Sequence, residues 1–158
     1  MKRRSWLHQD NDEIPRKETV VDDAEKAERD AAARIRAQLL ASTASYESEQ
    51  AKKLVDRFVG QAREVGLPTV ELRARTLDGA TVRTNTRGWY IRNDHSVAIG
   101  EDGNYYQLTV AAGFMSRIRG VRLEPSPPPL VVGRGGKEGE TGDLKDFLNR
   151  ALAGQVRP

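Results

Sequence analysis

The chain has 158 residues, of which 31% are charged and 37% hydrophobic, and 26 basic against 23 acidic side chains give a formal net charge of +3. Its length suits one domain with additional polar segments, since the hydrophobic content is low for a core that runs from end to end. No apolar run approaches the roughly 18 residues of a membrane-spanning helix. The absence of cysteine excludes disulfides and fits a reducing compartment. We expect a cytoplasmic protein with no membrane association.

Residues 1–21 are polar, aperiodic and interrupted by Pro15, which predicts a disordered or extended tail. Trp6 and Leu7 form an apolar pair within this tail. Such a pair can bind in a partner's groove, fold back onto its own domain, or be incidental. We retain both residues as candidates for partner binding.

Residues 22–42 predict an alanine-rich accessory helix, in which Asp22 and Glu25 resemble a capping box. Alanine favours the helix, but its burial stabilises far less than that of leucine. The helix is therefore expected to dock loosely on the domain or to lie against a partner, with Ile35 and Leu39 as candidate contact residues. The apolar stripe consists of Ala24, Ala27, Ala31, Ile35 and Leu39.

The α+β domain is predicted over residues 46–153. After a break at 42–45, residues 46–65 form an amphipathic helix, which Gly66 ends with a left-handed cap before Pro68. Its apolar face is formed by Ala51, Leu54, Val55, Phe58, Val59, Ala62 and Val65.

From Thr69 the apolar period becomes two, which indicates β-strands. Turns at 78–79, 93–94 and 101–104, with a break at Gly88, predict an antiparallel meander of four to five strands. An edge strand is expected at about 120–124. The fold class is thus a two-layer α+β domain in which the helix covers one sheet face and the other face is more solvated.

The prolines at 125 and 127–129 cannot continue a sheet. Pro125 and Pro128 match a PxxP ligand for an aromatic groove, although a stiff spacer is the simpler interpretation. A last helix is predicted over 143–153 with Asp143 as its N-cap, followed by a tail at 154–158.

Residues 133–142 form a glycine-rich loop before that helix. Arg134, Gly135, Gly136 and Lys137 are candidates for holding an anion or phosphate ligand with backbone amides. Lys137 is followed by Glu138, so the P-loop pattern fails, and a flexible connector is the alternative.

Arginines and tyrosines on the predicted strands are candidates for nucleic-acid binding, because single-strand binders combine basic grooves with aromatic stacking on a sheet face. Core or rim packing, or a protein-binding face, is the alternative, and only Tyr90 and Tyr105 are expected to form an exposed pair. The candidates are Arg73, Arg75, Arg83, Arg92, Tyr90 and Tyr105.

His95 lies between Asp94 and Ser96 in a predicted turn, where a structural role is expected. With His8 as the only other histidine, we expect no metal site, no cofactor and no catalytic residues. The sequence therefore predicts a non-enzymatic protein-interaction or adaptor module with a protein partner. The alternatives are a nucleic-acid accessory protein and an anion binder, and the oligomeric state is not predicted.

Overall fold

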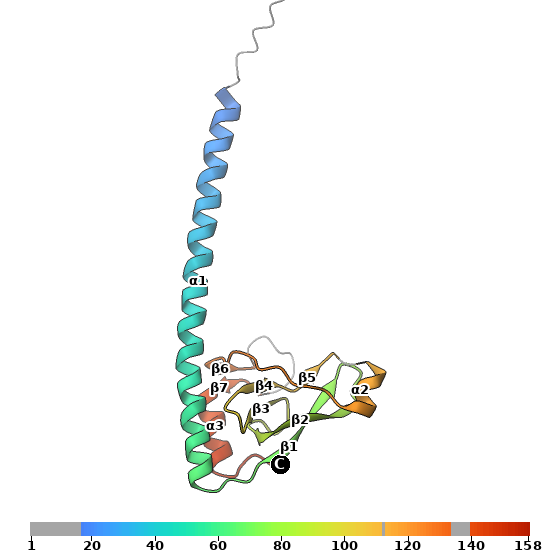
Figure 1. Cartoon of the computed structure of the whole chain (residues 1–158). Helices are drawn as coiled ribbons and strands as arrows, with labels where there is room; N and C mark the ends of the chain where they lie inside the picture. The colour runs from blue at the N-terminus through green and yellow to red at the C-terminus, as the bar shows by residue number, and fades with distance from the viewer. Residues whose placement is uncertain (1–16, 112, 134–139) are drawn as a thin grey trace, which may run out of the picture. The chain divides into compact units, whose positions relative to one another are not determined.

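The computed structural model describes residues 17–111, 113–133 and 140–158 (Figure 1). The chain divides into two compact units, Met1–Ser42 and Thr43–Pro158. The candidate residues Trp6, Leu7 and Arg134 to Lys137 lie outside the described residues.

Helix α1 spans Lys17–Glu64, 48 residues, where two helices were expected. The expected break at 42–45 is absent because Ser42, Thr43 and Ser45 only lower helix propensity, and neither glycine nor proline interrupts the segment. The helix also begins seven residues before Ala24, so residues 17–21 are helical.

The end of α1 follows the predicted cap. Gly66 has a φ of 68°, and the backbone N–H of Leu67 donates to the Ala62 carbonyl at 2.8 Å. The Gly66 N–H donates to the Arg63 carbonyl at 3.2 Å, which completes a Schellman motif. Val65 lies beyond the helix and is exposed, so its assignment to the apolar face is wrong.

The five-stranded sheet has the order β4-β3-β2-β1-β5, and its pairs are antiparallel except that β5 runs parallel to β1. The α+β class is thereby confirmed. The last strand departs from a simple meander, because the chain crosses from β4 to the opposite edge. The strands are β1 (Val70–Thr76), β2 (Thr81–Tyr90), β3 (Val97–Gly100), β4 (Tyr105–Gln107) and β5 (Thr109–Val110).

The predicted break at Gly88 is wrong, because β2 continues through it to Tyr90. Gly88 pairs with Val70 on one side and with Gly100 on the other. A Cβ atom there would lie 2.1 Å from the Ile99 carbonyl oxygen. The glycine therefore serves close strand packing and does not interrupt the strand.

The remaining chain forms short elements around the sheet. The edge strand expected at 120–124 is reduced to a single bridge between Val121 and Thr84. The expected last helix is confirmed with Asp143 at its N-cap position. The elements are α2 (Phe114–Arg119), β6 (Val131–Val132), β7 (Gly142–Asp143) and α3 (Leu144–Leu152).

Two hydrophobic clusters cover the two sheet faces. In the first, residues 51–62 of α1 and one side of α3 pack on Trp89, Ile99 and Tyr105, as the side-by-side helices in Figure 1 show. The face expected to be more solvated carries the second cluster, because the chain at 121–123 folds over it. That cluster consists of Leu72, Ala74, Val82, Tyr90, Ala98, Tyr106, Leu108 and Leu123.

Candidate interaction surfaces

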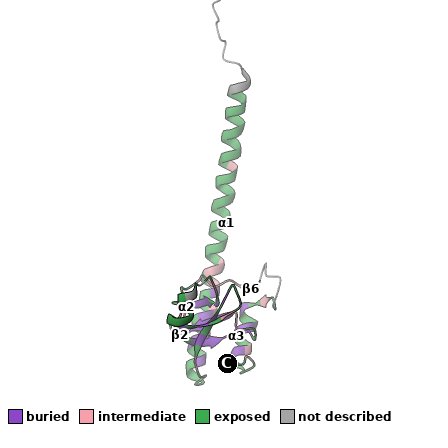
Figure 2. Ribbon diagram, turned by 90° about the vertical axis from the view of Figure 1, so that its right-hand side faces the viewer, coloured by how far each residue is buried: buried purple, intermediate pink, exposed green. Residues whose placement is uncertain are grey.

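The helix surface, defined as residues 20–42 of α1, is exposed at every position except the half-buried Ala32 (Figure 2). Val20, Val21 and Ile35 are 66%, 55% and 57% exposed, and Leu39 and Leu40 are 63% and 71% exposed. Contact of Ile35 and Leu39 with a partner stays a prediction, and both side chains are largely exposed to solvent. An ion pair between Arg29 and Glu25 at 2.9 Å stabilises this part of the helix.

The arginine face, defined as Arg73, Arg75 and Arg83, lies on β1 and β2. All three side chains are exposed, because they alternate with the buried Leu72, Ala74 and Val82. Arg73 is directly opposite Arg83 in the antiparallel register.

Like charges placed opposite each other destabilise a strand pair. Within the described ranges, the side chains of Arg73 and Arg83 form no ion pair with an acidic residue. Arg75 is partly compensated, since its charge acts on Asp94. The hairpin therefore places three arginines on one face, and two of them, Arg73 and Arg83, are opposite each other.

The expected exposed tyrosine pair is wrong, because Tyr90 and Tyr105 are only 8% and 3% exposed. Tyr90 and Tyr105 belong to the second and the first hydrophobic cluster respectively, so neither sheet face presents them as a stacking platform. Burial raises the pKa of Tyr105 to about 12, although the charge of Arg92 opposes the shift.

Arg92 is also buried, so it cannot extend the arginine face. Its Nη2 atom lies 3.2 Å from Asp94 Oδ2, and its guanidinium group lies 5.9 Å from the centre of the Phe147 ring. Burial raises the pKa of Asp94, but hydrogen bonds from Ser96 and the charges of Arg92 and Arg75 outweigh it and leave that pKa below its usual value.

His95 has a structural place in the β2–β3 turn. Its ring stacks on Tyr90 with 4.0 Å between centroids, and its Nε2 atom lies 2.9 Å from the Arg157 carbonyl oxygen. The Ser96 hydroxyl donates to Asp94 at 2.6 Å. The histidine contacts the C-terminal segment and Tyr90, so these three neighbours are not arranged as a catalytic relay.

A polar pocket of about 560 Å³ lies between the β3–β4 turn and the segment that contains Pro125. In it, the Tyr106 hydroxyl donates to the Asp102 carboxylate, which also accepts from the Asn104 backbone N–H at 3.0 Å. Burial raises the pKa of Asp102, but these hydrogen bonds outweigh it and lower the pKa overall. Burial and Asp102 raise the pKa of Tyr106. At neutral pH the pair is therefore a carboxylate and a protonated phenol. Groups that transfer protons in catalysis have pKa values near the working pH, so this hydrogen bond is better explained as one that stabilises the β3–β4 turn.

Pro125 is exposed and Pro128 is half-buried. Between them, the Ser126 backbone N–H donates to the Tyr105 carbonyl at 2.9 Å. The proline segment is thus attached to the edge strand β4, which agrees with the spacer interpretation. Binding of a partner to Pro125 and Pro128 stays a prediction.

An apolar pocket of about 330 Å³ was not expected from the sequence. It is lined by Pro68, Trp89 and the C-terminal Val156, among others, and these residues are far apart in the chain. Two of the lining residues are joined by a hydrogen bond, in which Trp89 Nε1 donates to the Leu67 carbonyl at 3.0 Å. No local pattern could have indicated this pocket, because it exists only after the connection between α1 and β1, strand β2 and the C-terminal segment meet.

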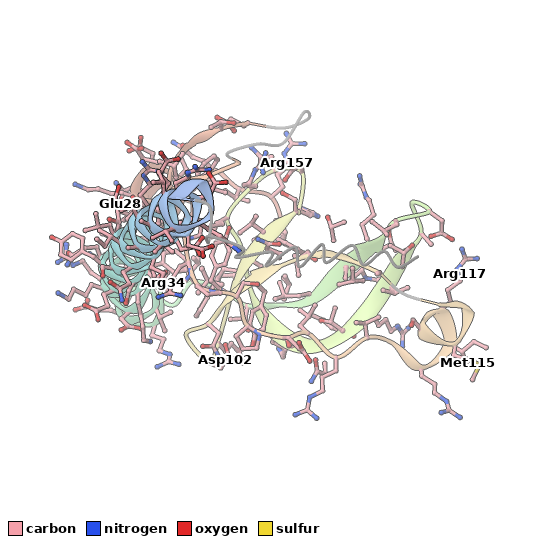
Figure 3. All side chains as sticks on the ribbon, turned by 90° about the horizontal axis from the view of Figure 1, so that it is seen from above. Glu28, Arg34, Asp102, Met115, Arg117 and Arg157 are labelled. Atoms are coloured by element: carbon pink, nitrogen blue, oxygen red, sulfur yellow. The ribbon has the colours of Figure 1, made fainter. Side chains whose placement is uncertain are left out.

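Three exposed apolar residues near the β1–β2 turn were also missed. Leu77 is in the turn, and Met115 and Ile118 are on α2. The ion pair between Arg117 and Asp78 connects the two elements (Figure 3 labels Met115 and Arg117).

In the part of the chain that the structure describes, no three metal-ligating side chains gather at one place, and no helix is long and apolar enough to cross a membrane. Comparison with known proteins gives no match to a family model, to a curated protein or to a solved structure.

Proposed function

We propose that the chain is a non-enzymatic protein-interaction module of the cytoplasm, in which the helix surface binds a partner. The observation that carries this proposal is the exposure of Val20 and Ile35, which lie on the same side of one helical segment. The absence of cysteine is compatible with the proposed compartment.

In the part of the chain that the structure describes, both hydrophobic clusters consist of residues beyond position 50, and none of their members comes from residues 20–42. A helix in water is stabilised mainly by packing of an apolar face. A partner that covers the exposed aliphatic side chains would supply that packing.

The test compares partner capture by the full chain and by the fragment 43–158. We expect the full chain to retain a partner in a pull-down and the fragment to lose it. A point substitution provides a second test, in which Ile35→Glu is expected to weaken capture of the partner. Arg36→Glu changes a neighbouring polar position and is the control, which is expected to capture the partner as the natural chain does. The same partners on the fragment as on the full chain would contradict the proposal.

The arginine face supports a second candidate function, nucleic-acid binding, because Arg73 and Arg83 are exposed, opposite each other and without an acidic partner among the described residues. Phosphates would relieve the repulsion between the two guanidinium groups. Without an exposed aromatic platform at Tyr90 and Tyr105, such binding would depend on charge.

The corresponding test is a gel-shift assay at low salt with single-stranded and duplex oligonucleotides. Retardation that weakens steeply with added salt, and that is lost in the double variant Arg73→Glu with Arg83→Glu, is expected if phosphate contacts dominate. Arg29→Glu with Arg36→Glu carries the same charge change on the helix surface and is the control. Absence of retardation at low salt would remove this candidate.

The anion site at Arg134, Gly135, Gly136 and Lys137 stays a hypothesis from the sequence. A thermal-shift measurement with inorganic phosphate tests it, because a ligand at 100 times its dissociation constant stabilises by about 2.7 kcal/mol.

A further inference from the structure

Charge is divided unevenly along the helix surface. Residues 22–30 contain five acidic and two basic side chains, whereas residues 31–42 contain Arg34 and Arg36 and no acid. The helix dipole does not explain this division, since it acts within the first and last turns and α1 continues to Glu64. The acidic and basic halves meet in the interior of the helix.

The helix surface has an apolar stripe that is bordered by different charged residues on its two sides. At 3.6 residues per turn, Val20, Ala24, Ala27, Ala31 and Ile35 lie on one side of the helix. Asp23, Asp30 and Arg34 border this stripe on one flank and Glu28 borders it on the other. Figure 3 shows Glu28 and Arg34 leaving α1 in different directions.

We propose that the partner of this stripe is a second copy of the chain, bound antiparallel with its two-fold axis near Ala31. This inference deepens the proposed function and rests on it. In an antiparallel pair of helices each flank meets the same flank of the other helix. Arg34 then approaches the partner's Asp30, and the symmetry repeats this pair on the other side of the axis.

A parallel pair would place unlike flanks together. Asp30 would then approach the partner's Glu28, which is repulsive, and Arg34 would approach no acidic residue of the partner. The charges therefore favour the antiparallel arrangement and disfavour the parallel one.

The sizes of the apolar side chains agree with the same register. With Ala31 at the axis, Ala27 is opposite the partner's Ile35, so a small side chain faces a large one and the helices can approach closely. Val20 and Ala31, and Ala24 and Ile35, are each 11 residues apart. That repeat matches 3.67 residues per turn, which keeps one stripe along two helices that supercoil slightly in the right-handed sense.

The first test measures the mass of the full chain in solution by sedimentation. We expect a dimer for the natural sequence and its loss in Ala31→Glu, which brings two carboxylates together at the axis. Ala33→Glu, the same substitution on the opposite side of the helix, is the matched control and should remain dimeric. Circular dichroism of both variants checks that the helix is retained.

The second test determines orientation and uses the absence of cysteine from the chain. Ala31→Cys is expected to form a disulfide-linked dimer on oxidation. Ser42→Cys is not, because the two copies of residue 42 would lie about 33 Å apart in an antiparallel pair. Ser42→Cys mixed with Val20→Cys should form the crossed species.

A monomer at all concentrations, or a dimer unaffected by Ala31→Glu, would overturn the inference, as would an efficient Ser42→Cys crosslink. A monomeric chain that still captures a different protein, and loses it through Ile35→Glu, would contradict self-association while supporting the proposed function. The two failures are thereby distinguishable.

Discussion

Single positions in the sheet are fixed by neighbours that are remote in the chain, and Gly88 is the clearest case. Any side chain there meets backbone atoms, the Ile99 carbonyl oxygen and the Gly100 Cα, which cannot move as a flexible side chain could. Gly60 differs, since a Cβ added to it finds no heavy atom within 4 Å.

Gly88→Ala is expected to destabilise the domain by about 1 to 3 kcal/mol or more, because the β2–β3 spacing must change. Gly60→Ala, in an exposed helical position, should instead stabilise by about 0.5 to 1 kcal/mol. Urea unfolding of both variants measures the difference. A Gly88→Ala variant as stable as the natural chain would contradict the close packing.

Tyr105 provides a pH-dependent test. Its pKa is raised from the ordinary value of 10.0 to about 12, so the folded state holds the phenolic proton more tightly than the unfolded state does. Its contribution is complete below pH 10 and is lost as the pH rises towards 12. Tyr105→Phe should make the free energy of unfolding less dependent on pH in this window, as measured by denaturant unfolding. Tyr46→Phe, an exposed tyrosine, is the control.

At the scale of elements, the β1–β2 hairpin combines a well-specified turn with an unfavourable pair of charges. Asp78–Gly79 forms the turn, with Gly79 at a φ of 87°. Arg73 and Arg83 face each other on the exposed side. An anion bound between these two side chains would reduce the repulsion between their guanidinium groups.

Arg83→Glu is expected to stabilise the chain by roughly 0.2 to 1 kcal/mol, because an opposite-charge pair replaces a like-charge one. Adding Arg73→Glu restores like charges and should remove the gain. Thermal unfolding of the two variants provides the measurement. Equal stability of the single variant and the natural chain would show that solvent already screens the two arginines.

For the whole molecule, all residues of both hydrophobic clusters lie within the compact unit Thr43–Pro158. The unit contains the end of α1 from Ala51 to Ala62, which is a structural part of the core. The boundary of the folded domain therefore falls inside a continuous helix.

The fragment 43–158 is expected to unfold cooperatively in urea. The fragment 60–158 lacks Ala51, Val55, Phe58 and Val59, which are buried against the sheet, and should show no cooperative transition. Loss of cooperativity in the longer fragment would show that residues 1–42 contribute to the core.

The sequence by itself determined the elements whose signals are local. The stripe from Ala51 to Ala62, the cap at Gly66, the two Asp-Gly turns and the last helix follow from side-chain period and backbone freedom, which act between near neighbours. The exposure of Arg73, Arg75 and Arg83 follows from the same alternation.

Only the tertiary structure decided which faces and surfaces exist. The burial of Tyr90, Tyr105 and Arg92, the place of β5 beside β1, and the role of Gly88 depend on segments that meet across the fold. The alternation of apolar and polar residues specifies which side chains share a face of the sheet. Whether that face is buried depends on which other segments of the chain pack against it.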